Sequence, residues 1–248
     1  DWTRFDGTIP RALLKHIKDL RWEKINKQHR ERYKHVHDWY VHNLLTRYVL
    51  MPTGEVTIQR RGNPSGQIST TMDNNMVNYW LQAFEFAFLN KGKDIETLWN
   101  DYDTIVYGDD RLTSSPSVPD DYVPRVVAMY KDVFGMWVKP EKVKVADTII
   151  GASFCGFTVG KNYQPVPSNP EKLWASLVTP CQKLPDEFAL YGKLLSFKIL
   201  MRNSEDHPFK DYVEKCIAAL EHGRSLPKIT DEQLDRLWRG GPKTNPNG

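Results

Sequence analysis

Two adjacent aspartates, Asp109 and Asp110, follow Gly108 in the stretch DTIVYGDDRL, which occupies residues 103–112. The apolar residues around them predict two short strands joined by a tight turn, with both carboxylates at its tip. Adjacent anions repel each other, so a chain that places them together needs a positive partner. Hard divalent cations such as Mg²⁺ bind carboxylate oxygens and supply that charge. Gly-Asp is also ordinary turn composition, so this pair alone is weak evidence for a metal site.

Two further aspartates, Asp1 and Asp6, open the chain in the stretch DWTRFDG. If Asp1 ends a strand that begins upstream, its side chain can lie beside the hairpin tip. Asp1 and Asp109 would then bind divalent metal ions, with Asp110 as a supporting acid. In phosphoryl transfer, two such ions activate the attacking oxygen and stabilise the leaving one. The two acidic elements together therefore predict a metal-dependent phosphoryl-transfer site.

A loop that contains Gly62, Pro64 and Gly66 lies between the two acidic elements and leads into a predicted helix. Helix capping by Ser69 or Thr70, with Asp73 near the positive end of the helix dipole, explains part of the composition that follows. It does not explain why amides accumulate before the helix turns apolar. These amides are suited to recognising a sugar hydroxyl, and they belong to Asn74, Asn75 and Asn78.

The elements that must position these residues are helices and short strands without regular βαβ units, which predicts an α+β fold. Apolar spacing predicts helices within 10–46, from 69 to 89, and from 123 to a C-cap at Gly135. Short strands are predicted around Pro52-Thr53-Gly54, in the hairpin at 103–112, and within 143–159. Residues 164–170 contain three prolines and predict a loop at an internal boundary. The remainder is predicted to be mostly helical, with a disordered end at 242–248.

The composition excludes several classes of protein. The chain has 248 residues, 40% of them hydrophobic, and a formal net charge of only +3, so overall charge does not demand a nucleic-acid partner. Three cysteines without CxxC spacing argue against a disulfide framework and a cysteine zinc site, and they favour a reducing compartment. The histidines of HVHDWYVH, at residues 35–42, lack the paired ligands of a zinc site. No apolar stretch is long enough to predict a transmembrane segment.

Five blocks of this sequence resemble, in family order, the palm motifs of viral RNA-dependent RNA polymerases. DWTRFD is similar to motif A, GNPSGQISTTMDNN to motif B, YGDD to motif C, WVKPEKVKV to motif D and ASFCGF to motif E. The amino-acid sequences of motifs A, B and E are most similar to those of astrovirus polymerases, within the picornavirus-like group. The blocks extend over residues 1–157, and residues 158–248 carry no such motif.

The resemblance implies a polymerase palm, with an antiparallel sheet packed on helices, followed by a mainly helical thumb. The palm is expected at 1–163, with a partial fingers insertion at about 20–62, and the thumb at 164–248. The chain begins at motif A, so the fingers are expected to be largely missing and the chain to be a fragment.

The resemblance also implies roles for individual residues of this chain. The implied metal ligands are Asp1 and Asp109, with Asp110 beside them. Lys142 would protonate the leaving pyrophosphate, although Lys139 and Lys144 are close alternatives. The nucleotide would be bound by Asp6, Ser65, Gly66, Thr70 and Asn74, and the RNA by Phe154, Cys155, Gly156, Lys198 and Arg202. Three of these residues have plain structural alternatives: Cys155 as a small buried hydrophobe, and Lys198 and Arg202 as a charged solvent-facing surface.

The activity that the resemblance implies is RNA-templated RNA synthesis, in which a primer 3′-hydroxyl attacks the α-phosphate of a ribonucleoside triphosphate. Two Mg²⁺ ions, for which Mn²⁺ can substitute, are the implied cofactors. Implied partners are template and product RNA, ribonucleoside triphosphates, a genome-linked protein primer and other viral replication proteins. The implied location is the host cell cytoplasm, at membrane-associated viral replication complexes.

Two alternatives are compatible with parts of this pattern. A reverse transcriptase shares the palm, but it needs a bulky residue that excludes the 2′-hydroxyl, where this chain has Asp6. A catalytically inactive RNA-binding polymerase fragment gains nothing from clustered carboxylates, because they repel phosphates. RNA-directed RNA polymerase therefore accounts for more of the sequence than either alternative.

Overall fold

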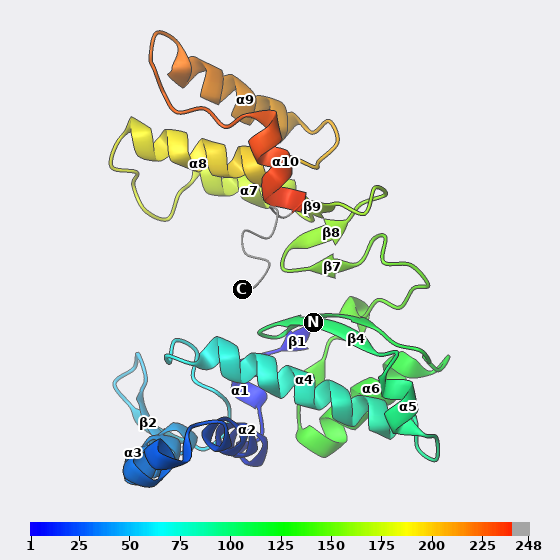
Figure 1. The fold of residues 1–248 in the computed structure, drawn as a ribbon. Coiled ribbons are helices and arrows are strands. Elements are labelled where there is room, and N and C mark those ends of the chain that lie inside the picture. Colours follow the sequence, from blue (N-terminus) through cyan, green and yellow to red (C-terminus); the bar gives the residue numbers. More distant parts are fainter. Residues whose placement is uncertain (240–248) are drawn as a thin grey trace. The chain divides into compact units, whose positions relative to one another are not determined.

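The computed structural model describes residues 1–239, and contacts within the chain divide it into two compact units (Figure 1). The first unit is Asp1–Val145, and the second begins at Ala146. This division falls earlier than the predicted boundary between 163 and 164. It separates groups of contacts and does not test the palm and thumb assignment, which stays a prediction. The predicted disorder at 242–248 lies outside the described residues.

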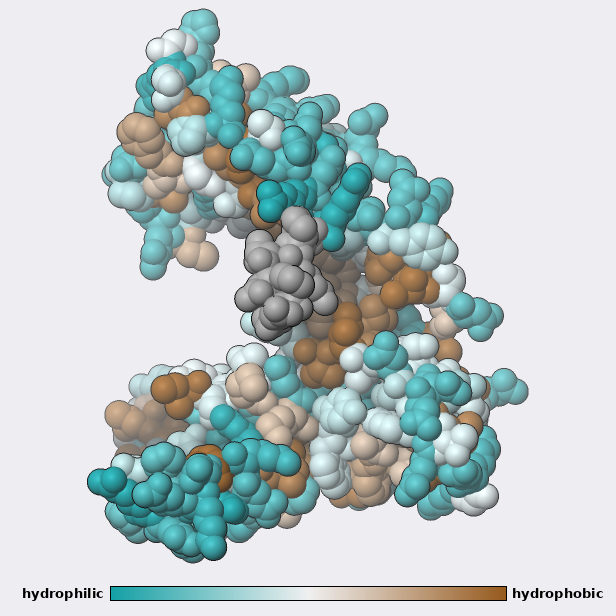
Figure 2. Space-filling model, in the orientation of Figure 1, coloured by the Kyte–Doolittle hydropathy of each residue, from teal (hydrophilic) through white to brown (hydrophobic). Residues whose placement is uncertain are grey.

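The first part of the first unit is helical, and its basic helix faces solvent. Asn26 caps the second long helix, because its side-chain oxygen accepts a hydrogen bond from the Gln28 backbone N–H at 2.9 Å. The basic residues around this cap are exposed or half-buried, and Figure 2 shows a largely hydrophilic surface over α3. The elements are β1 (Trp2–Thr3), α1 (Phe5–Thr8), α2 (Arg11–Glu23), α3 (Lys27–Leu45), β2 (Arg47–Leu50) and β3 (Val56–Gln59).

Helix α4 (Thr70–Leu89) is the central element of the first unit, and both α2 and β4 pack against it (Figure 1). Its buried apolar residues Val77 and Leu81 join a core with Leu14 and Ile17 of α2. The strand β1 pairs antiparallel with β6. The remaining elements are α5 (Ile95–Trp99), β4 (Asp103–Tyr107), β5 (Asp110–Ser114), α6 (Tyr122–Met129), the π-helix η1 (Tyr130–Phe134), β6 (Trp137–Val138) and the 3₁₀-helix η2 (Pro140–Lys142).

The second unit combines a small sheet with helices that bury their own apolar cluster. Leu194, Phe197, Phe209 and Val213 form part of that cluster, between α8 and α9. Its helical character agrees with the sequence-based prediction for this part of the chain. The elements are β7 (Ser153–Phe154), β8 (Phe157–Val159), β9 (Pro165–Pro167), α7 (Pro170–Val178), α8 (Glu187–Leu200), α9 (Pro208–Glu221) and α10 (Asp231–Arg239).

Sequence-based predictions of local structure differ from the structure in two segments. Of residues 143–159, where short strands were predicted, 153–154 and 157–159 are strands and 143–152 are not. Val145 is 53% exposed, and the segment shares backbone hydrogen bonds with β8 only at its end, between Gly151, Ala152 and Val159. Residues 164–170, predicted as a loop, contain β9, which pairs with β8. Backbone hydrogen bonds at the two ends of this pairing use the Gln164 carbonyl and the Ser168 N–H, which bond to Gly160 and Gly156 beside β8, so they do not need the missing N–H groups of Pro165 and Pro167.

No helix among residues 1–239 has the length and apolar character needed to span a bilayer.

Candidate active site

The hairpin that carries Asp109 and Asp110 forms as predicted. Strands β4 and β5 pair antiparallel with Tyr107 opposite Asp110, so Gly108 and Asp109 form a two-residue turn. Gly108 has φ 62°, whereas Asp109 is not among the residues with positive φ, which matches a type II′ turn. Both aspartates are exposed. The turn therefore presents carboxylate oxygens to solvent from a backbone that the sheet fixes.

Two asparagines of α4 hold the backbone of this turn. The Gly108 backbone N–H donates to Asn75 Oδ1 at 2.6 Å. Asn78 Nδ2 donates to the carbonyl oxygens of Gly108 at 3.1 Å and Asp110 at 3.3 Å. Asn75 and Asn78 therefore position the hairpin tip, and recognition of a sugar hydroxyl by their amides stays a prediction. Asn75 and Asn78 are three residues apart on α4, so they share a face of the helix.

A fully buried glutamine, Gln82, continues this row one turn further along α4. It donates to Asn78 Oδ1 at 3.1 Å, which orients the Asn78 amide so that its nitrogen faces the turn. Its own oxygen accepts from the hydroxyls of Thr104 at 2.7 Å and Thr113 at 2.9 Å, in the two strands of the hairpin. The helix thus holds the hairpin at its tip and along its length.

A charge pair between a half-buried arginine and a buried glutamate completes the attachment of the hairpin. Arg111, which follows the two aspartates, forms two parallel hydrogen bonds with Glu85 of α4, at 3.0 and 2.9 Å. The hydroxyls of Tyr122 and Tyr130 each donate to Glu85 at 2.6 Å. Burial alone would raise the pKa of the Glu85 carboxyl, but Arg111 and these hydrogen bonds hold that pKa below its ordinary value. Sequence reasoning missed this cluster, since Glu85 and Arg111 are 26 residues apart.

Asp1 lies in the electrostatic environment of the hairpin tip. Burial lowers the pKa of its α-amino group, and the carboxylates of Asp110 and Asp109 act in the opposite direction. The Asp1 carboxylate forms an ion pair with Lys139 Nζ at 3.1 Å, and its backbone oxygen accepts from the Lys139 N–H at 3.0 Å. Lys139 is thus the lysine beside Asp1. Lys142 ends η2 and is exposed, so its assignment as the proton donor stays a prediction.

The carboxylates do not form a closed metal cage. Within residues 1–239, no group of three or more His, Cys, Asp or Glu side chains is arranged to hold a metal ion. Mg²⁺ usually takes only one or two protein carboxylates and fills its shell with water and substrate phosphates. Exposed carboxylate oxygens such as those of Asp1 and Asp109 have the chemistry that this ion prefers, so the donor set is compatible with it.

The predicted sugar-reading residues Asp6 and Asn74 are in direct contact. Asn74 Nδ2 donates to Asp6 Oδ1 at 2.6 Å, and Ser65 Oγ donates to the other oxygen of the same carboxylate. Thr70 Oγ1 bonds to the Pro64 carbonyl at 2.8 Å, so this hydroxyl shapes the loop. Gly66 is exposed, with φ 88°. The structure thus brings Asp6, Ser65 and Asn74 together, and their roles toward a nucleotide stay predictions.

Gly62 allows the loop to lie against the start of the chain. Its φ is 82°, and a Cβ there would come within 2.7 Å of the Asp6 carbonyl oxygen. The Gly62 N–H donates to the Ile9 carbonyl at 2.9 Å, and the Asn63 N–H donates to the Asp6 carbonyl at 2.7 Å. A glycine is required here because both the backbone angle and the close approach exclude a side chain.

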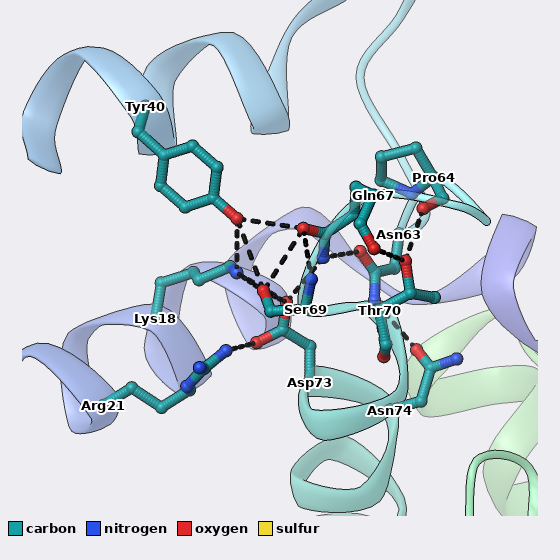
Figure 3. Close-up of polar contacts among 10 residues, drawn as sticks. All are labelled: Lys18, Arg21, Tyr40, Asn63, Pro64, Gln67, Ser69, Thr70, Asp73 and Asn74. Carbon is teal, nitrogen blue, oxygen red and sulfur yellow. Dashed lines mark hydrogen bonds and ion pairs between the residues drawn. The ribbon is translucent and has the colours of Figure 1, made fainter.

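Asp73 is fully buried in a cluster that joins α4 to α2 and α3 (Figure 3). Its two oxygens contact Lys18 Nζ and Arg21 Nη1, each at 2.5 Å. Lys18 also donates to Tyr40 and Ser69, at 2.9 and 3.0 Å. Favourable interaction with the helix dipole, which the sequence suggested for Asp73, is therefore a smaller part of its role than this buried ion pair.

The second unit carries the predicted RNA-binding residues of motif E. Phe154 pairs with Phe157 across a two-residue turn, in which Cys155 has φ 50° and Gly156 has φ 79°. Positive φ at both turn positions matches a type I′ hairpin. Cys155 is exposed, so the alternative that it is a small buried hydrophobe was wrong. RNA binding by these three residues stays a prediction.

Lys198 of α8 and Arg202, which follows this helix, form ion pairs within their own unit. Lys198 contacts Glu214 at 3.0 Å, and Arg202 contacts Asp231 at 2.8 Å and Asp235 at 3.0 Å. A phosphate bound here would have to compete with these carboxylates. Binding of RNA by Lys198 and Arg202 stays a prediction, and the ion pairs give weight to the structural alternative.

Of the two asparagines at the turn, Asn78 donates hydrogen bonds and Asn75 accepts one, so the substitution of each by aspartate should have different effects. We expect Asn78→Asp to loosen the hairpin tip, because it replaces a buried donor by an anion that faces two carbonyl oxygens. The cost of about 1–3 kcal/mol corresponds to roughly 5- to 150-fold faster amide exchange in the peptide that spans the turn. Asn75→Asp is the matched control, because Asn75 acts there as an acceptor and a carboxylate keeps that function. Hydrogen–deuterium exchange of the full-length protein measures both; equal protection in Asn78→Asp and wild type would contradict the assignment.

Comparison with known proteins gives a consistent set of relatives. The family model described as viral RNA-dependent RNA polymerase matches residues 1–179. The non-structural polyprotein 1AB of human astrovirus-1 is 63% identical over 248 residues, which covers 98% of this chain and 17% of that polyprotein. The polyprotein of the same name from ovine astrovirus 1 is 53% identical over 257 residues, with 98% and 19% covered. The chain therefore spans less than a fifth of the length of these curated relatives.

Solved structures show the same fold at low sequence identity. The crystal structure of the RNA-dependent RNA polymerase of a human picorbirnavirus aligns with a TM-score of 0.66 and 16% identity, covering 90% of this chain and 41% of that chain. An insertion loop deletion mutant of that polymerase aligns with a TM-score of 0.64, covering 95% and 43%. The predicted α+β fold class is confirmed by this likeness.

Proposed function

Because this chain belongs to the family of viral RNA-dependent RNA polymerases, we propose that it carries the nucleotidyl-transfer site of such an enzyme. The reaction is RNA-templated addition of ribonucleotides to an RNA 3′-hydroxyl during viral genome replication and transcription. The chain covers only part of its relatives, so the proposed activity is that of the full-length polymerase that contains it.

The observation that carries this proposal is that one helix holds both halves of the site. Asn74 of α4 contacts Asp6, and Asn75, the next residue, contacts the turn that bears Asp109. A nucleotide bound to both halves would have its sugar at Asp6 and its triphosphate at the carboxylates of the turn. The rigid helix would then fix the distance between the two, which is how enzymes gain rate through positioning.

The carboxylates of Asp1 and Asp109 would hold two Mg²⁺ ions, with Asp110 beside them, and Mn²⁺ can substitute. When bound, these ions supply charge neutralisation for the triphosphate and lower the pKa of the attacking hydroxyl. Lys139, paired with Asp1, balances the carboxylate charge until substrate arrives. Lys142 is the proposed donor of a proton to the leaving pyrophosphate.

The proposed partners follow from this reaction and from the relatives. Template and product RNA and ribonucleoside triphosphates are the substrates and products, and Phe154, Cys155 and Gly156 are proposed to contact the RNA 3′ end. The relatives are non-structural polyproteins of astroviruses, so we propose other viral replication proteins and a genome-linked protein primer as further partners. The proposed location is the host cell cytoplasm, at membrane-associated replication complexes.

The Asp6→Ala variant tests whether this site reads the ribose. We expect its preference for ribo- over deoxyribonucleotides to fall roughly 10- to 150-fold, since a hydrogen bond to a charged group contributes about 1.5–3 kcal/mol. The measurement compares kcat/KM for a ribonucleotide and its deoxy analogue in the full-length polymerase. Asp120→Ala, at an exposed loop position, is the matched control. An unchanged ratio in Asp6→Ala would exclude the assigned role and reopen the reverse transcriptase alternative.

A further inference from the structure

A row of hydrogen-bonded side chains connects the buried Asp73 cluster to the sugar-reading pair, Asp6 and Asn74. Figure 3 shows the row from Asp73 to Asn74. Gln67 Nε2 donates to Asp73 Oδ2 at 2.8 Å and to Asn63 Oδ1 at 3.2 Å. Asn63 Nδ2 donates to Asn74 Oδ1 at 2.9 Å. Asn74 Nδ2 then donates to Asp6 Oδ1 at 2.6 Å. The row runs from one carboxylate to another through three amides.

The end of the row at Asp73 has a fixed polarity. An ionised carboxylate only accepts hydrogen bonds. Asp73 is fully buried, and the cations of Lys18 and Arg21 contact its two oxygens. Gln67 must therefore turn its NH₂ group toward Asp73. Its oxygen faces the other way, where it accepts from the Tyr40 hydroxyl at 3.0 Å and the Ser69 N–H at 3.0 Å.

This polarity determines the orientation of every amide that follows. Because the Gln67 NH₂ group also meets Asn63, the Asn63 oxygen must lie on that side and its nitrogen on the side of Asn74. The Asn74 oxygen then faces Asn63, and its nitrogen faces Asp6. Asn63 is only 2% exposed and Asn74 only 5%, so water does not replace these partners readily. A reversed Asn74 amide would point its oxygen at the Asp6 carboxylate.

We propose that Asn63 and Gln67 are positioning residues for sugar discrimination, and that they orient the Asn74 amide by relaying the polarity of Asp73. The inference rests on the proposed function and adds to it. The specificity of the Asp6–Asn74 pair depends on a buried carboxylate that touches neither the nucleotide nor Asp6. In this arrangement, the ion pair with Lys18 and Arg21 keeps Asp73 an acceptor.

The test uses Asn63→Asp in the full-length polymerase, because this nearly isosteric change removes the donor that fixes Asn74. The Asn74 amide is then expected to turn its nitrogen toward residue 63 and its oxygen toward Asp6. We expect the kcat/KM ratio of a ribonucleotide to its deoxy analogue to fall at least about tenfold, which equals about 1.4 kcal/mol. Asn43→Asp is the matched control, since Asn43 is exposed on α3 and its side chain donates to the Trp39 carbonyl of the same helix at 2.7 Å, away from the row.

Two further variants separate an effect on the orientation of the Asn74 amide from an effect on the stability of the protein. Gln67→Glu, at a half-buried position one step earlier, keeps the acceptor for Tyr40 and Ser69 and loses the donor, so the ratio should also fall. In Asn63→Asp combined with Asp6→Asn, the row can form with reversed polarity. We expect this double variant to regain thermal stability relative to Asn63→Asp while its ribose preference stays low. The readout of this variant is its thermal stability, because loss of the Asp6 carboxylate by itself lowers the ribose preference; no recovery of stability would contradict the reversed polarity of the row.

The outcomes are distinct. A wild-type ratio in a folded Asn63→Asp or Gln67→Glu variant would overturn the relay and leave the proposed function intact. A wild-type enzyme that adds no ribonucleotides on an RNA template would overturn both. If Asn63→Asp does not fold, the ratio in Gln67→Glu decides, because that side chain is less buried.

Discussion

Replacement of Asp109 by asparagine is expected to lower the rate of ribonucleotide addition by at least about a thousandfold, with the fold retained. The loss corresponds to about 4 kcal/mol of transition-state stabilisation, in the range of several kcal/mol that a catalytic metal supplies. Asparagine keeps the size of the side chain but removes the charge that binds the ion. The fold should survive because Asp109 is exposed, and α4 holds the turn through the backbone of Gly108 and Asp110.

The measurement is single-nucleotide extension of an RNA primer by the purified full-length variant, with thermal unfolding measured in parallel. Asp101→Asn serves as the control, because this aspartate is exposed and lies shortly before β4. We expect the control to retain wild-type activity. A folded Asp109→Asn variant with undiminished activity would refute the metal assignment.

Replacement of Arg111 by methionine is expected to destabilise the hairpin by about 3–5 kcal/mol, the usual cost of removing one partner of a buried ion pair. The Glu85 carboxylate would stay buried and keep only the hydroxyls of Tyr122 and Tyr130. Hydrogen–deuterium exchange of the β4–β5 peptides measures the free energy of opening. Arg125→Met is the control: Arg125 is an exposed residue of α6 that faces Asp121 at 3.6 Å, and such pairs contribute at most about 1 kcal/mol.

The pH dependence of stability provides an independent test of the role of the Glu85–Arg111 pair. Because the folded-state pKa of Glu85 is lowered, its contribution to stability is present above the unfolded-state pKa of about 4.3 and is lost as pH falls through the folded-state value. In Arg111→Met, burial would raise this pKa instead, so acidification should reduce the difference between variant and wild type. Glu85→Gln combined with Arg111→Met should recover much of the lost stability. Equal exchange in Arg111→Met and wild type would contradict the role of the pair.

The sequence predicted the parts of the site that depend on local signals. The YGDD hairpin follows from alternating apolar residues around Gly108, and the helix after Ser69 follows from its apolar spacing. The hairpin and the helix each have a signature within a few neighbouring residues. Asp6 and Asn74 are 68 residues apart; the family resemblance gave them a shared role toward the ribose, and the structure places the two side chains 2.6 Å apart.

The supporting contacts could not be predicted in this way. Lys18 and Asp73 are 55 residues apart, and each alone reads as an ordinary surface charge. The amides of Asn74 and Asn75 are neighbours in sequence, but they serve different halves of the site because the helix turns them apart. Strand β9 was missed because prolines normally exclude a strand, and only its pairing with β8 shows which side of each proline matters. Such features depend on tertiary partners.

The most direct test of the central claim is the rate at which the full-length polymerase extends an RNA primer by one ribonucleotide. The assay compares reactions with and without Mg²⁺, and with a matched and a mismatched RNA template base. We expect extension that requires Mg²⁺, follows the template and prefers the ribonucleotide to its deoxy analogue. Extension that persists without divalent metal, ignores the template base or prefers the deoxynucleotide would contradict the assignment of this chain as the nucleotidyl-transfer site of an RNA-directed RNA polymerase.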